Sequence, residues 1–145
     1  MRLLRSALFV TVVLVSAGPV SSSTSAPQKQ TAETATQFYL RWRSTALNAK
    51  SIDEITPFWT AETVEEFNME PESARAETLA MMKRVYGGQT DVKVVKETAT
   101  PAGATLALEA RDGDQKPIVS SVDVVKEKGA WKITAAVEQW KPKGN

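Results

Sequence analysis

The stretch of sequence that decides the fold reads VDVVKEKGAWKI and spans residues 122–133. Its apolar residues alternate with polar ones on both sides of Lys128 and Gly129, which is typical of two antiparallel strands joined by a tight turn. With these two residues as the turn, Val124 lies opposite Ile133 in the predicted pairing. One face of this hairpin then collects four core-forming side chains: Val122, Val124, Trp131 and Ile133.

The same two-residue period extends over four predicted strands. They span residues 91–98, 104–112, 117–126 and 130–139, with turn-forming residues between them. A three-residue loop at Gly113-Asp114-Gln115 is favoured because it places Leu106 opposite Val122, on the same face as the last hairpin. In this register the carboxylates of Asp123 and Glu138 point to the outer face.

The segment before the strands has the period of a helix. In residues 31–50 the apolar side chains recur every three or four positions and share one face. They are Ala35, Phe38, Tyr39, Trp42, Ala46 and Ala49. Ser51 and Glu54 match a capping box that opens a short helix, and Thr60 is expected to cap another. A last helix is predicted over residues 71–86.

Helices first and strands afterwards predict an α+β domain, with the N-terminal helices packed on one face of a curved antiparallel sheet of about four strands. We place this single domain at residues 31–141 and a short tail at residues 142–145. Arg41 and Arg43 flank a core tryptophan, so we expect their stems to cover the core edge while their charges stay in water.

The N-terminal residues 1–17 match a secretory signal peptide. Arg2 and Arg5 come before an apolar run at residues 7–15, and Ala17 offers a small residue for cleavage, which is also conceivable as far as residue 26. The run is far shorter than the ~20 residues that a membrane-spanning helix needs. Residues 18–30 read as a disordered leader. We therefore expect an exported protein, periplasmic or extracellular, with no stable membrane span after cleavage.

Composition excludes several kinds of chemistry. The chain has no Cys and no His, so disulfides, thiol nucleophiles and Ser-His-Asp catalysis are excluded. Its 18 Lys and Arg nearly balance 17 Asp and Glu, and no basic run is present, so we expect no nucleic-acid partner. We also predict no metal site and no cofactor.

Three segments resemble the nuclear transport factor 2-like superfamily of cone-shaped α+β domains, in particular its small exported bacterial members. These segments are residues 35–42 (ATQFYLRW), 79–83 (LAMMK) and the hairpin 122–133. The resemblance covers roughly residues 31–139 and implies a conical pocket between helices and sheet. Some members of this superfamily are enzymes, and others bind ligands or assemble with partners.

The predicted helices carry several aromatic side chains toward the inner face of the sheet. The candidate pocket residues are Tyr39, Trp42, Trp59, Tyr86, Leu106, Ser120 and Trp131. Aromatic walls with few hydroxyls suit an apolar or aromatic small molecule, so we expect a non-catalytic binding domain. The alternative for each residue is that it only fills the core. A homodimer through the outer sheet face, where Val119 and Val125 lie, is a further alternative.

An acid/base enzyme of the isomerase, dehydratase or cyclase type is the remaining alternative. Tyr39 or Tyr86 would donate a hydrogen bond, and Glu97 or Glu109 would be the base if a bulge turned it inward. A carboxylate buried inside the cone and left unpaired would favour this alternative.

Overall fold

The computed structural model describes residues 32–134 and 138–144, which belong to one compact unit, Ala32–Asn145. The predicted signal peptide and leader, residues 1–30, lie outside the described residues. Helix α1 (Ala35–Asn48) is followed by the 3₁₀ turns η1 (Ile52–Glu54) and η2 (Thr56–Phe58), and by helices α2 (Ala61–Asn68) and α3 (Glu72–Gly87). The strands are β1 (Thr90–Ala99), β2 (Gly103–Arg111), β3 (Pro117–Glu127), β4 (Ala130–Ile133) and β5 (Lys141–Pro142).

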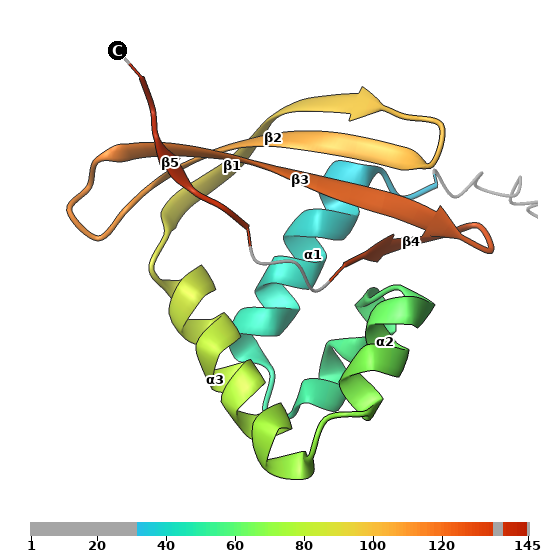
Figure 1. Ribbon diagram of the computed structural model, residues 1–145. Coiled ribbons are helices and arrows are strands. Elements are labelled where there is room, and N and C mark those ends of the chain that lie inside the picture. The colour runs from blue at the N-terminus through green and yellow to red at the C-terminus, as the bar shows by residue number, and fades with distance from the viewer. Residues whose placement is uncertain (1–31, 135–137, 145) are drawn as a thin grey trace, which may run out of the picture. The chain divides into compact units, whose positions relative to one another are not determined.

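The strands form one antiparallel sheet in the order β1-β2-β3-β4, and β5 pairs with β3 near the start of that strand. Helices α1, α2 and α3 lie on one face of this sheet (Figure 1), which confirms the predicted α+β class. The pairing of Leu106 with Val122 and of Val124 with Ile133 is the predicted one. Lys128 and Gly129 both have positive φ, as a two-residue hairpin turn requires.

The core lies between α1 and the inner face of the sheet. All six apolar residues predicted for the buried stripe of α1 are at most 2% exposed. They belong to the same buried cluster as Leu106, Leu108, Val124 and Ile133 from the sheet. Ser51 and Glu54 form the predicted N-terminal contact of η1, in which a Glu54 carboxylate oxygen accepts from the Ser51 backbone N–H at 3.3 Å.

The prediction of one strand over residues 130–139 is wrong, because β4 ends at Ile133 and the described residues 134 and 138–140 belong to no strand. Val124 pairs with Ile133, while Ile118, six positions earlier, pairs with Pro142, nine positions later. The chain therefore carries three more residues here than a regular ladder would use. An odd number of extra residues exchanges the two faces of a strand. As a result Glu138 is buried instead of lying on the outer face, and Pro142, which we assigned to the tail, belongs to the sheet.

Gly103 offers a test of this packing, because the start of β2 passes very close to β3 at this residue. A Cβ on Gly103 would clash with the carbonyl oxygen of Val124 and lie 2.7 Å from the Cα of Val125. We expect Gly103→Ala to lower the free energy of unfolding by about 2 kcal/mol or more, measured by urea denaturation. The control is Gly113→Ala, which meets open space and should change stability little. Equal losses in the two variants would contradict the predicted clash.

Candidate functional site

A buried polar cluster lies between α1, α3 and the C-terminal segment. The carboxylate of Glu138 accepts hydrogen bonds from the hydroxyl of Tyr39 at 2.7 Å and from the indole N–H of Trp140 at 3.0 Å. Arg43 Nη1 lies 3.8 Å from the same carboxylate, and Arg43 Nη2 donates to the backbone carbonyl of Tyr86 at 2.6 Å. The cluster therefore joins both helices to the end of the chain.

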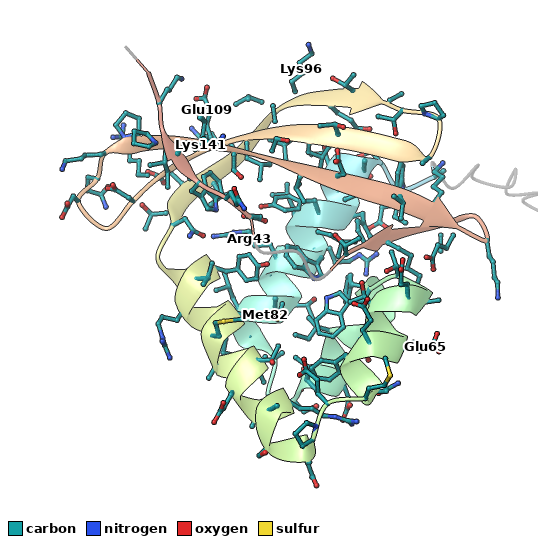
Figure 2. The ribbon with its side chains drawn as sticks, in the orientation of Figure 1. Arg43, Glu65, Met82, Lys96, Glu109 and Lys141 are labelled. Carbon is teal, nitrogen blue, oxygen red and sulfur yellow. The ribbon has the colours of Figure 1, made fainter. Side chains whose placement is uncertain are left out.

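Contrary to the prediction, the charged group of Arg43 does not extend into water. The residue is 6% exposed, and Figure 2 places it in the interior between the sheet and the helices. Its guanidinium also lies over the ring of Tyr86, 5.4 Å from the centroid, and donates to the side chain of Gln89 at 3.1 Å. These contacts replace hydration, so the charge is held inside. Arg41 behaves as expected, with its guanidinium exposed at the edge and 4.8 Å from the centroid of the Phe58 ring.

Burial governs the pKa values of the cluster. Removal from water raises the pKa of Glu138 above its ordinary value, and the bonds from Tyr39 and Trp140 and the charge of Arg43 offset only part of this. Burial also raises the pKa of Tyr39 well above its usual range, and the nearby carboxylate raises it further. The pKa of Tyr86 is raised by the same two causes. Both tyrosines therefore keep their protons.

The carboxylate that would favour an acid/base enzyme is thus present but paired. Among the described residues, the two oxygens of Glu138 have two hydrogen-bond donors and one cation as partners. Such a network ties α1 to the C-terminal segment, and a group satisfied in this way acts first as a structural anchor.

The other two candidate bases have different roles. The pairing of β1 with β2 shifts between Val94 and Lys96, and Glu97 accepts from the backbone N–H and the hydroxyl of Thr36 at 3.0 and 2.7 Å. These bonds lower the pKa of Glu97, so it is a poor base and instead holds the start of α1. Glu109 forms a 2.7 Å salt bridge with Lys143.

The predicted pocket residues do not share one surrounding. Tyr39, Trp42, Tyr86 and Leu106 are at most 2% exposed and belong to the hydrophobic core. Trp42 packs edge-on against Tyr86, with 5.0 Å between the ring centroids. These four side chains therefore fill the interior, which is the alternative that the sequence left open for each of them.

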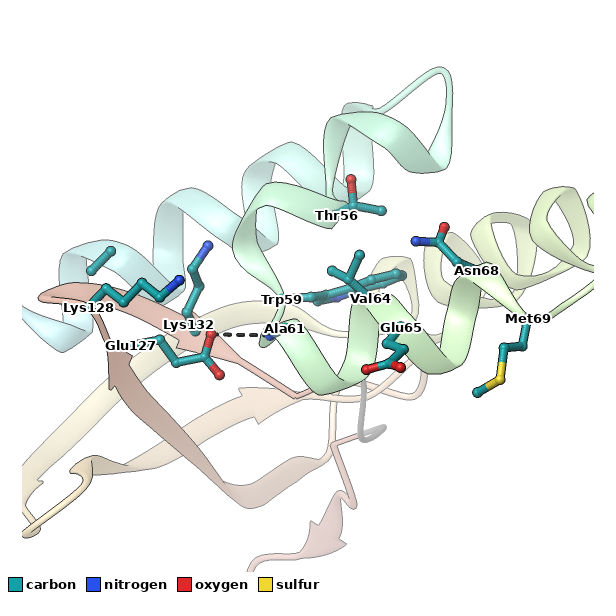
Figure 3. A pocket seen from close by; sticks show the side chains of 11 residues that line it. Thr56, Trp59, Ala61, Val64, Glu65, Asn68, Met69, Glu127, Lys128 and Lys132 are labelled. Carbon is teal, nitrogen blue, oxygen red and sulfur yellow. Dashed lines mark hydrogen bonds between the residues drawn. The ribbon is translucent and has the colours of Figure 1, made fainter.

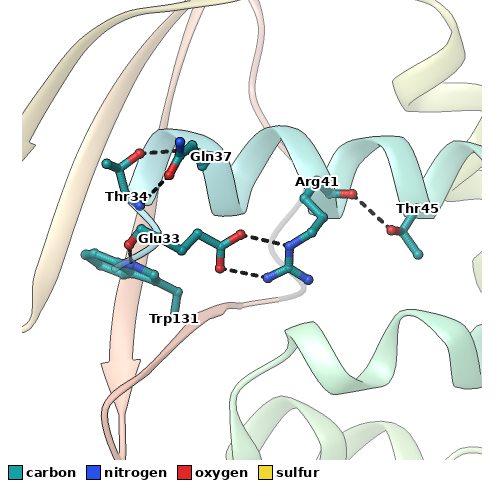
Figure 4. Close-up of polar contacts among 6 residues, drawn as sticks. All are labelled: Glu33, Thr34, Gln37, Arg41, Thr45 and Trp131. Atoms are coloured by element: carbon teal, nitrogen blue, oxygen red, sulfur yellow. Dashed lines mark hydrogen bonds and ion pairs between the residues drawn. The ribbon is translucent and has the colours of Figure 1, made fainter. Parts of the chain in front are cut away.

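Ser120 and Trp131 lie at the margin of the core and make structural contacts. The hydroxyl of half-buried Ser120 donates to the carbonyl of Gln139 at 2.9 Å and so fixes the C-terminal segment. The indole N–H of Trp131 donates to the carbonyl of Glu33 at 2.8 Å (Figure 4). The Glu33 carboxylate in turn holds Arg41 through two 2.8 Å bonds, which fixes the hairpin against the start of α1.

The remaining predicted residue, Trp59, forms part of an open groove between α2 and the β3–β4 hairpin (Figure 3). We call it the α2–hairpin groove. It has a volume of about 760 Å³. Its lining residues are Thr56, Trp59, Ala61, Val64, Glu65, Asn68, Met69, Glu127, Lys128, Ala130 and Lys132. Met69, which is 76% exposed, has the highest exposure of the large apolar side chains in the described part of the chain.

This groove could not be recognised from the sequence, because its walls come from residues 56–69 and 127–132, which are far apart in the chain. Contacts between them hold the groove in shape. The backbone N–H of Thr60 donates to the carbonyl of Ile133 at 3.1 Å, and the N–H of Ala61 donates to the Glu127 carboxylate at 3.1 Å. The one available signal was Met69, a large apolar residue that follows α2 directly and is exposed.

The outer face of the sheet shows Val119 and Val125 half-buried, with Lys96, Glu109 and Lys141 on the side away from the helices (Figure 2). The homodimer through this face stays a prediction. Within residues 32–134 and 138–144, no group of three or more Asp or Glu residues could hold a metal ion. No helix in that same part is long and apolar enough to cross a membrane.

Comparison with known proteins does not assign this chain to a family. No protein-family model matches the chain, and neither a curated protein nor a solved structure matches it.

The pKa directions of two carboxylates give a test of the cluster. Because folding raises the pKa of Glu138, the stability that its proton contributes is fully present below pH 4.5 and is lost as the pH rises through the raised pKa. We therefore expect the free energy of unfolding of the wild type, relative to Glu138→Gln, to fall as the pH rises above 4.5. Urea denaturation at a series of pH values measures this difference.

Glu97 provides the matched control, because its pKa is lowered by folding. Its contribution is present above pH 4.5 and is lost as the pH falls through the lowered pKa. The wild type relative to Glu97→Gln should therefore gain stability with rising pH, opposite to the Glu138 comparison. If both free-energy differences changed in the same direction with pH, the assignment of Glu138 as the buried carboxylate and Glu97 as the exposed one would be contradicted.

Proposed function

We propose that this protein is an exported, non-catalytic domain that binds an apolar or aromatic small molecule in the α2–hairpin groove. The observation that carries the proposal is the open groove of about 760 Å³ with an apolar floor. Small-molecule sites in proteins typically measure roughly 300–1,000 Å³, with mostly apolar walls and a few polar groups. The groove has a volume in this range, with apolar walls from Trp59, Val64 and Met69 and polar groups around them.

The proposed site is therefore outside the cone interior. The interior is filled by side chains such as Tyr39 and Trp42, whereas the groove exposes apolar surface to solvent. Met69 and Val64 form its α2 wall. Methionine is flexible and polarizable, and it is common on surfaces that accept ligands of varied shape. Met69 therefore adds exposed apolar surface to the end of the groove away from the hairpin.

Export is the second part of the proposal. It is supported by Arg2 and Arg5 before the apolar run 7–15 and by the small residue Ala17. Membership of the nuclear transport factor 2-like superfamily is likewise proposed. It is supported by the order of elements, in which three helices come before an antiparallel meander whose last hairpin carries the quoted motif.

One observation supports the alternative of an acid/base enzyme using a tyrosine and a carboxylate. The hydroxyl of Tyr39 lies 2.7 Å from the carboxylate of Glu138, and burial raises both pKa values. Glu138 lines a surface pocket of about 530 Å³ together with Ser120, but Tyr39 is fully buried. A substrate in that pocket would therefore have to displace part of the core to reach the tyrosine. This function therefore ranks second.

A pair of methionine variants tests the binding proposal. We expect Met69→Asp to weaken binding of decanol and of 1-naphthol by about tenfold or more, because it replaces an apolar wall with a charge. Isothermal titration calorimetry measures the affinity. The control is Met81→Asp on α3, since Met81 is 44% exposed and does not line the groove. The proposal fails if neither compound binds the wild type, or if both variants bind like it.

A further inference from the structure

We infer that the ligand of the α2–hairpin groove is an anionic amphiphile, with its acidic group at the hairpin end and its apolar part toward Met69. This inference rests on the proposed function and names its ligand class. It comes from the uneven distribution of charge along the groove. Figure 3 shows Lys128, Lys132 and Glu127 near the hairpin, whereas Asn68 and Met69 lie at the other end.

The hairpin end has an excess of available positive charge. The Glu127 carboxylate accepts from the backbone N–H of Ala61 at 3.1 Å, so it is already used at the start of α2. Lys132 Nζ donates to the carbonyl of Pro57 at 2.7 Å and keeps two further protons for a ligand. Lys128 forms no ion pair with any described residue and lies at the turn of the hairpin. The hairpin end of the groove therefore carries two ammonium groups and one carboxylate, and that carboxylate already accepts a hydrogen bond.

The rest of the groove disfavours a negative charge. Trp59 and Val64 form the apolar middle, and the exposed carboxylate of Glu65 lies on the α2 wall beside them. An acidic group placed near Glu65 would be repelled, whereas one placed near Lys128 would be attracted. The orientation of the ligand follows, since the only attractive end for its acid is the hairpin.

Decanoic acid and decanol test this inference, because they share one chain and differ in the charged group. We expect decanoate to bind about tenfold more tightly than decanol at neutral pH, and added salt to reduce this preference. In the double variant Lys128→Gln and Lys132→Gln, decanoate should bind no better than decanol. The measurement is isothermal titration calorimetry below the micelle concentration.

The matched control is Lys126→Gln. Lys126 lies on the same hairpin, but its ammonium group is placed over the ring of Trp131, 4.6 Å from the centroid, and it does not line the groove. This variant should keep the preference for decanoate. Equal binding of decanoate and decanol by the wild type would overturn the inference and leave the proposed function intact. If neither decanoate nor decanol binds, the inference falls, and the proposed function falls with it if 1-naphthol does not bind either.

A membrane surface presents the same chemistry as a free acid, and a separate measurement distinguishes them. Cosedimentation with phosphatidylcholine vesicles, with and without oleic acid, reports binding to an anionic bilayer. We expect the protein to bind monomeric decanoate and to stay in the supernatant with both kinds of vesicle. Pelleting with the acidic vesicles without binding of monomeric decanoate would overturn the inference.

Discussion

The hydrogen bond between Tyr39 and Glu138 is the contact on which the interior depends. A carboxylate in an apolar core is destabilising unless donors and a cation compensate for its lost hydration. Here the compensation comes from Tyr39 at 2.7 Å, Trp140 at 3.0 Å and Arg43 at 3.8 Å. Arg43 is itself held by the carbonyl of Tyr86. The first helix, the third helix and the end of the chain therefore depend on one another.

This arrangement determines where a ligand has room. Glu138 lies buried against Tyr39 and Arg43, and the aromatic side chains of α1 fill the space beside it, so this part of the interior is occupied by protein groups. The apolar surface that stays open lies outside, where α2 meets the β3–β4 hairpin. The same side chain, Trp59, serves both regions, since it is part of the core cluster and also lines the α2–hairpin groove.

Much of the fold could be predicted from the sequence, because it follows from periodic patterns. The stripe of α1 and the pairing of Val124 with Ile133 each satisfy a hydrophobic match that has one solution. Glu138 could not be placed in this way. Its position depends on three extra residues between paired segments, and no local pattern marks them. The turn of Glu97 toward α1 has the same kind of cause, a register shift within β1.

The candidate site was harder to predict because it combines surface residues from separate segments. One end of the groove is held in place by contacts between α2 and the hairpin. The edge of β4 is covered by a bridge between Trp59 and Ile133, reinforced by the bond from Thr60 to the Ile133 carbonyl. These contacts protect an exposed strand edge and also hold α2 against the hairpin. The fixed end is the one that carries Lys128 and Lys132. Lys132 is already oriented by its bond to the Pro57 carbonyl, which lowers the entropic cost of binding a charged group there.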